Sequence, residues 1–223
     1  MVEPTRTPLD RARVLQAAVE LADRDGLAAV SMRALASELG VVPMALYKHV
    51  ADKGDLVDGM VDTVVAGYAV PDAALRGADA VRARVLAART ALLAHPWLRG
   101  AIETRTRRTP TVLSHMDAVA GAFIADGYSV DLTHHAMHAL GHRIWGFSPE
   151  AFEAAPAAPP PPAEQEAMLR MMAERFPHVT AIAIDSATRN PSGACDDDGE
   201  FAFTLDLLLD AFARLRASGW TSA

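Results

Sequence analysis

Between residues 31 and 53 the chain reads Ser31-Met-Arg-Ala-Leu-Ala-Ser-Glu-Leu-Gly-Val-Val-Pro-Met-Ala-Leu-Tyr-Lys-His-Val-Ala-Asp-Lys53. Apolar residues recur here at steps of three and four, which predicts two short helices, at about 32–39 and 43–49. Gly40 lies between them and favours a tight turn. Ser31 is a good N-cap for the first helix, because its hydroxyl can accept a hydrogen bond from a free backbone N–H.

The apolar residues of this stretch share one side of each helix. Ala36 is small and permits close approach of the two helices. Such a pair of helices, with one turn between them, has the geometry of a helix-turn-helix, whose second helix enters the major groove of DNA. The alternative is a small helical domain that packs without touching DNA. The residues that face the common core are Leu35, Ala36, Leu39, Leu46 and Val50.

Several side chains of the motif suit DNA chemistry. Arg33 can reach a guanine edge or a phosphate, and Met44 and Ala45 can meet a thymine methyl group. Tyr47 and His49 can donate hydrogen bonds to phosphates. Residues 5–7 form a possible arm along the DNA backbone. The predicted DNA-binding residues are Arg33, Val42, Pro43, Met44, Ala45, Tyr47, Lys48, His49 and Lys53.

Outside this motif the periodicity stays helical, and no segment alternates convincingly as a strand would. Helices are expected near residues 9–25 and 52–68, and a break at Val70-Pro71-Asp72 suggests a domain boundary. We therefore predict an all-α chain with a DNA-binding domain over 1–68 and a helical ligand-binding and dimerisation domain over 69–223. Its expected helices are 78–95, 109–126, 131–147, 163–176, 179–188 and 200–218, with loops at 154–162 and 189–199.

Composition narrows the class of protein further. The 223 residues are 51% hydrophobic, which is enough for a sizeable core, and the single cysteine, Cys195, excludes an intrachain disulfide. No apolar run is long enough for a membrane span and no signal core is visible, so we expect a cytoplasmic protein without a membrane partner. The net charge of -7 means that any DNA contact depends on local placement of cations.

The chain resembles the tetracycline-repressor (TetR) family of transcription regulators. The resemblance is strong over about residues 9–65, and it is weaker over the rest, which looks like the ligand domain of the branch containing the tetracycline repressor. Val42 stands where relatives often have a polar cap residue, so no operator sequence is carried over. The motifs that carry the resemblance are Arg33-x-Leu-Ala-x-x-Leu-Gly-Val41, Leu46-Tyr-x-His-Val50, Asp52-Lys-x-x-Leu56, His95-Pro-Trp-Leu98 and Ala139-Leu-Gly-x-x-x-Trp-Gly-Phe147.

The resemblance implies an all-helical dimeric repressor that a small ligand releases from operator DNA. It also implies that the last helix, 200–218, pairs with its copy in the dimer interface. The effector, the operator and the target genes stay unidentified, and the family's tetracycline–magnesium chemistry is not carried over. The alternatives are a regulator that activates, and a helical small-molecule or metal-binding protein whose DNA domain is vestigial.

The C-terminal part carries the candidate effector residues. His134, His138 and His142 recur every four residues and so share one helix face, where they could bind a metal or simply be polar pocket residues. We assign no metal site and no cofactor. Flexible methionines with histidine and tryptophan suit an adaptable apolar cavity between helices 78–147 and 163–176. Its candidate residues are Trp97, His115, Met116, His134, His138, Trp145, Met168 and Met172.

Enzymatic activity is not expected. The sequence has no nucleophile motif, no glycine-rich phosphate loop and no His-Glu-x-x-His zinc motif. Asp196-Asp-Asp198 lacks the alternate spacing of a calcium loop and is read as a solvated turn.

Overall fold

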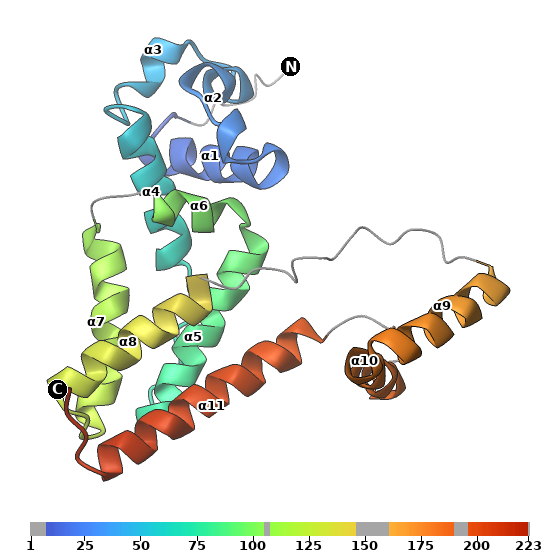
Figure 1. Ribbon diagram of the computed structural model, residues 1–223. Coiled ribbons are helices and arrows are strands. Elements are labelled where there is room, and N and C mark those ends of the chain that lie inside the picture. The colour runs from blue at the N-terminus through green and yellow to red at the C-terminus, as the bar shows by residue number, and fades with distance from the viewer. Residues whose placement is uncertain (1–7, 105–107, 146–160, 190–195, 223) are drawn as a thin grey trace. The chain divides into compact units, whose positions relative to one another are not determined.

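The structure is a computed structural model that describes residues 8–104, 108–145, 161–189 and 196–222. Helices alone form the regular structure of these residues, which confirms the predicted all-α class (Figure 1). The chain divides into one unit of residues 1–146 and 209–223 and another of residues 147–208. None of the described helices is long and apolar enough to cross a membrane.

Four α-helices and one 3-10 turn form the N-terminal part of the first unit. Three of the helices begin at a capping side chain: Asp10 accepts a hydrogen bond from the backbone N–H of Arg13 at 2.8 Å, Ser31 from that of Ala34 at 3.1 Å, and Asp52 from that of Asp55 at 2.8 Å. The Ser31 cap confirms the prediction, whereas the first helix begins later than the sequence indicated, because its cap is Asp10. The elements are α1 (Arg11–Asp25), η1 (Leu27–Ala29), α2 (Met32–Glu38), α3 (Pro43–Leu46) and α4 (Lys53–Ala66).

One apolar core joins these helices. The residues expected to face it do so: Leu35, Ala36, Leu46 and Val50 are buried, and Leu39 packs against them. The same core also contains Trp97, Leu98 and Ala101. These belong to α6 (Trp97–Glu103), a short helix that we did not predict, because seven residues after a proline show too little periodicity.

The remaining helices of the first unit are α5 (Gly77–Ala94), α7 (Pro110–Ala125) and α8 (Val130–Trp145). α7 contacts α4, α5 and α8. The ring of Phe123 in α7 meets Phe212 with 6.1 Å between centroids, and Arg216 forms an ion pair with Asp126. The domain boundary near residue 68 stays a prediction; the break itself lies between α4 and α5.

The second unit contains α9 (Pro162–Arg175), α10 (Pro177–Arg189) and the first part of α11 (Asp197–Ala217). α9 packs against α10. The predicted loop over 189–199 is wrong at its end, because Asp196 accepts a hydrogen bond from the backbone N–H of Gly199 at 2.9 Å and the helix begins at Asp197. Most of the predicted proline loop lies outside the described residues, and α9 begins at its last proline, Pro162.

Candidate nucleic-acid interface and effector region

The turn between α2 and α3 sets the geometry of the candidate interface. Gly40 has φ +64°, a conformation that costs a side-chain-bearing residue free energy, so the glycine has a clear structural role. The backbone N–H of Val41 then donates to the carbonyl of Ala36 at 2.9 Å. Pro43 occupies the first turn of α3, where its missing N–H costs nothing. The helix is shorter than the predicted 43–49, and Tyr47 to His49 continue as turns.

Apolar side chains are left exposed on this element. Val42 is 67% exposed, Met44 72% and Tyr47 48%, whereas Leu46 and Val50 of the same segment are almost fully buried. The segment therefore has one face in the core and another with three large apolar or aromatic groups in solvent. Exposed apolar groups gathered on one small element indicate a contact surface.

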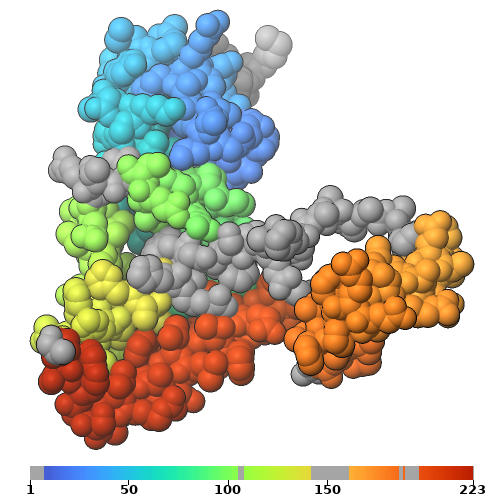
Figure 2. Space-filling view, in the orientation of Figure 1, coloured from blue at the N-terminus to red at the C-terminus, as the bar shows by residue number. Residues whose placement is uncertain are grey.

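The same helix-turn-helix region also carries exposed cations. Arg33 on α2, Lys48 after α3 and Lys53 at the start of α4 are all exposed, and none of the three forms an ion pair within the described residues. The segment of α3 and the turn after it (light blue) lies at the surface of its unit in the space-filling view (Figure 2). Because the chain as a whole is acidic, phosphate contact depends on local cations of this kind, whose charge is not neutralised by an ion pair within the described residues.

The other predicted DNA-binding residues differ in how exposed their side chains are. Pro43 is exposed, but Ala45 and His49 are half-buried. The possible arm at residues 5–7 lies outside the described residues. Their DNA contacts stay predictions.

An ion pair that sequence reasoning missed holds the end of the recognition segment. Arg11 in α1 donates to the backbone carbonyl of His49 at 2.6 Å and to both carboxylate oxygens of Asp55 in α4, at 2.9 and 2.7 Å. Asp55 also accepts from the backbone N–H of Ala51 at 2.8 Å. The Arg11 guanidinium, followed by the Ala51 N–H, lowers the pKa of Asp55 to about 2. Nothing in the sequence signals a pair 44 positions apart.

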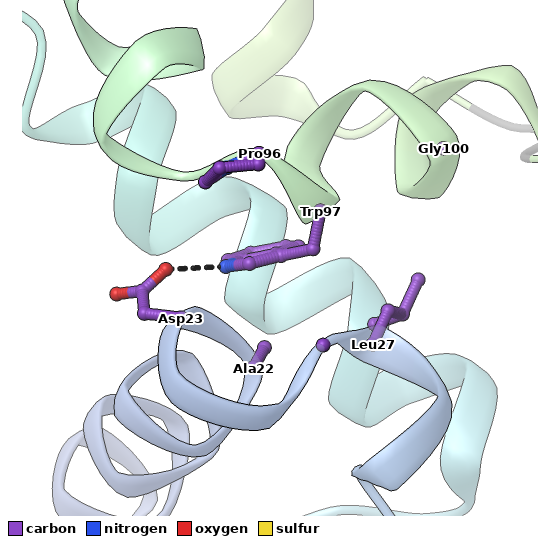
Figure 3. Close-up of a pocket in the computed structure, with 7 residues that line it drawn as sticks. Ala22, Asp23, Leu27, Pro96, Trp97 and Gly100 are labelled. Atoms are coloured by element: carbon purple, nitrogen blue, oxygen red, sulfur yellow. Dashed lines mark hydrogen bonds between the residues drawn. The ribbon is translucent and has the colours of Figure 1, made fainter. Parts of the chain in front are cut away.

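A second polar cluster lies between α1 and α6. Oδ1 of Asp23 accepts from Nε1 of Trp97 at 2.6 Å (Figure 3). The same oxygen lies 2.8 Å from Nδ1 of His95. Trp97 is only 7% exposed and belongs to the core of the DNA-binding helices. The structure thus places this predicted effector residue against α1.

The candidate effector region lies where α4, α5 and α7 meet. Tyr68, which follows α4, contacts His115 of α7 edge to face, with 5.0 Å between ring centroids. The Tyr68 hydroxyl is buried without a hydrogen-bond partner in the described part of the chain, and burial raises the pKa of Tyr68 to about 12. Burial, with the charge of Arg84 on α5, lowers the pKa of His115. His115 was predicted; Tyr68 was missed because a lone tyrosine after a helix carries no signal.

The other predicted effector residues do not converge there. Met116 is half-buried beside His115 in sequence, but His134 and His138 are exposed on α8, with 4.6 Å between their ring centroids. Met168 and Met172 lie on α9, in the second unit, so the pocket predicted between these groups stays a prediction. The Trp145 and His142 side chains lie outside the described residues. No group of three metal-ligating side chains occurs among the residues described.

One polar contact connects the effector region to α4. Thr109 caps α7 by accepting from the backbone N–H of Val112 at 3.3 Å, and its hydroxyl donates to Asp62 in α4. α4 carries Lys53 at one end and leads to Tyr68 at the other. This one helix therefore spans from the candidate interface to the effector region.

An all-helical chain with an exposed, cation-flanked helix-turn-helix has the architecture of a helix-turn-helix transcription regulator. The family model for bacterial regulatory proteins of the tetR family matches residues 14–60, and the model for the tetracyclin repressor-like C-terminal domain matches residues 77–215. The chain belongs to the TetR family, in the branch with this C-terminal domain, as its motifs predict.

Curated relatives are also regulators by name. An HTH-type transcriptional regulator from Saccharopolyspora erythraea is 34% identical over 125 residues, 56% of this chain and 53% of that protein. The HTH-type transcriptional repressor DrrR1 from Streptomyces coeruleorubidus is 36% identical over 121 residues, 52% of this chain and 45% of that protein. The chain spans about half the length of these two relatives.

A solved structure shares the fold over nearly the whole chain. The TetR family protein ActR from Streptomyces coelicolor, in complex with (S)-DNPA, superposes with a TM-score of 0.66 and 25% identity, covering 92% of this chain and 98% of that chain.

Proposed function

We propose that the chain is a ligand-responsive transcriptional repressor that binds a palindromic operator as a dimer. The observation that carries this proposal is the face formed by Val42, Met44 and Tyr47, exposed on a helix-turn-helix beside three cations without ion-pair partners among the described residues. Apolar groups there can meet thymine methyl groups, and the cations can meet phosphates and guanine. The proposed repressor acts in the cytoplasm and catalyses no reaction.

The dimer is supported by the pattern of α11. One face of this helix is buried through Phe201, Leu205, Leu209 and Phe212, yet Phe203 and Leu207, one turn apart, are exposed. A helix with apolar residues on both faces needs partners on both. A second copy of the chain is the occupant that the function requires, because a two-fold protein presents two recognition helices roughly 34–36 Å apart.

The effector response is proposed as a population shift. A small molecule that contacts Tyr68 and His115 would favour one placement of α4, through Tyr68 and through the Asp62–Thr109 contact. Movement of α4 changes the separation of the two recognition helices, so the paired operator contacts are lost. The ligand complex of ActR supports a small-molecule effector without identifying one for this chain.

A direct test is titration of the purified chain against the DNA upstream of its own gene, with salt varied and random DNA as competitor. Tight, salt-dependent binding that resists competitor supports the regulator. Binding no better than to random DNA, repeated with fragments of the whole genome, favours the rival of a small-molecule carrier with a vestigial DNA domain. Transcription from a bound promoter separates repression from activation.

A further inference from the structure

A cavity of about 410 Å³ opens between α1 and α6 (Figure 3), and neither Tyr68 nor His115 is among its lining residues. Ala22, Leu27, Pro96 and Trp97 form its apolar walls, and Asp23 supplies one carboxylate. The volume lies within the range of about 300–1,000 Å³ that small-molecule sites occupy. The cavity is large enough for a compact organic ligand.

The glycines of the cavity face open space. A Cβ atom placed on Gly26 or Gly100 would meet no atom within 4 Å. Gly100 lies on α6 without a positive φ, so a larger side chain there would fill space without backbone strain. The cavity can therefore be closed by one substitution that leaves its polar group in place.

The polar group selects the chemistry of the ligand. Both donors that Asp23 meets, from Trp97 and His95, reach the same oxygen, Oδ1. No donor within the described residues reaches Oδ2, which leaves one carboxylate oxygen able to accept. A protonated amine satisfies such an acceptor with a charge-assisted hydrogen bond, and an indole ring nearby attracts the same cation.

We propose that this cavity binds a small organic amine, with an aromatic or aliphatic body against Pro96 and Trp97 and its ammonium group at Asp23. An occupant contacts the last turn of α1 and the first turn of α6, which share the core of the helix-turn-helix. Its binding therefore alters operator affinity independently of the effector region. This regulatory part rests on the proposed function, whereas the binding itself does not.

The test is isothermal titration calorimetry of the full chain with tryptamine, and with indole-3-propionate as the anionic counterpart. Tryptamine binds saturably, and the carboxylate binds at least tenfold more weakly. Asp23→Asn, which keeps an oxygen acceptor for Trp97 but removes the charge, weakens tryptamine binding at least tenfold. Equal binding of amine and carboxylate, or no binding of tryptamine, overturns the proposal.

Gly100→Phe localises the site. It fills the cavity and weakens tryptamine binding at least tenfold, while Gly121→Phe on α7, whose added Cβ also meets nothing within 4 Å, leaves it unchanged. Circular dichroism confirms that both variants fold. Unchanged binding in folded Gly100→Phe overturns the location.

These titrations contain no DNA, so their outcome is separate from that of operator binding. Unchanged operator affinity at saturating tryptamine overturns the regulatory part.

Discussion

The indole Nε1 of Trp97 donates a 2.6 Å hydrogen bond to Oδ1 of Asp23, a residue 74 positions earlier in the chain. The bond ties α6 to the end of α1. Since Trp97 is buried in the core of the DNA-binding helices, these helices cannot move relative to α6 without breaking the bond or opening that core. A movement of α1 relative to α6 must therefore break this hydrogen bond.

Loss of the Asp23 carboxylate should destabilise the chain. Asp23→Ala leaves the buried indole N–H without its acceptor, which costs about 1–3 kcal/mol of unfolding free energy. Asp25→Ala, two residues on, removes only a surface pair with Arg24 and should cost less than about 0.5 kcal/mol. Urea unfolding measures both. Equal losses in the two variants would show that the Trp97 bond contributes nothing of its own.

Arg33 and Lys53 should have different roles on DNA. Lys53→Ala removes a cation that we propose contacts a phosphate, so it should weaken binding to all sequences and reduce the salt slope by about 1. Arg33→Ala should cost about 1–3 kcal/mol on the operator and relax base preference, with little change on random DNA. Fluorescence anisotropy on both DNAs at several salt concentrations checks this. Parallel losses on both DNAs in both variants would reject the division of roles.

The Arg11–Asp55 pair should make stability depend on pH in the acid range. The pKa of Asp55 is lowered to about 2 in the folded chain, so the pair stabilises fully above the unfolded pKa of about 4, and this stabilisation is lost as pH falls through 2. Because both side chains are partly exposed, we expect only about 1 kcal/mol. Asp55→Asn should therefore be less stable than the parent at pH 6, and the difference should shrink as pH falls through 2. A difference that stays constant with pH would contradict this account.

Gly40 should resist substitution for a backbone reason alone. A Cβ there meets no atom within 4 Å, but φ is +64°, so Gly40→Ala should cost about 1–2 kcal/mol. Gly121→Ala, in a regular helix with equally open space, should instead stabilise by about 0.5–1 kcal/mol. Thermal unfolding of both variants checks the opposite signs. A stable Gly40→Ala would mean that the turn does not need a positive φ.

The exposed face of α11 should hold the dimer together. Leu207→Lys places a charge on that face and should shift the chain to monomers in sedimentation velocity, with loss of operator affinity. Val70→Lys, at an exposed apolar residue between α4 and α5, should leave the dimer intact. If Leu207→Lys remains dimeric with parental affinity, the interface lies elsewhere.

The sequence predicted the helices that have caps, apolar periodicity and stop residues. It also predicted which side chains of the helix-turn-helix lie in the core. Arg33, Met44 and Lys53 could be proposed because their roles follow from position within a local motif. The Arg11–Asp55 and Asp23–Trp97 pairs could not, since each forms between residues that only the packed core brings together. Tyr68 could not be predicted as part of the effector region for the same reason, because only its contact with His115 in the folded chain places it there.

The proposed regulator must bind a specific DNA sequence as a dimer. Selection from a library of random duplexes with the purified chain, followed by sedimentation of the selected duplex with protein, tests it most directly. We expect a palindrome whose half-sites lie one helical turn or a multiple apart, occupied by two protomers or a multiple of two. Failure to enrich any sequence, or enrichment of a site bound by a single protomer, would contradict it.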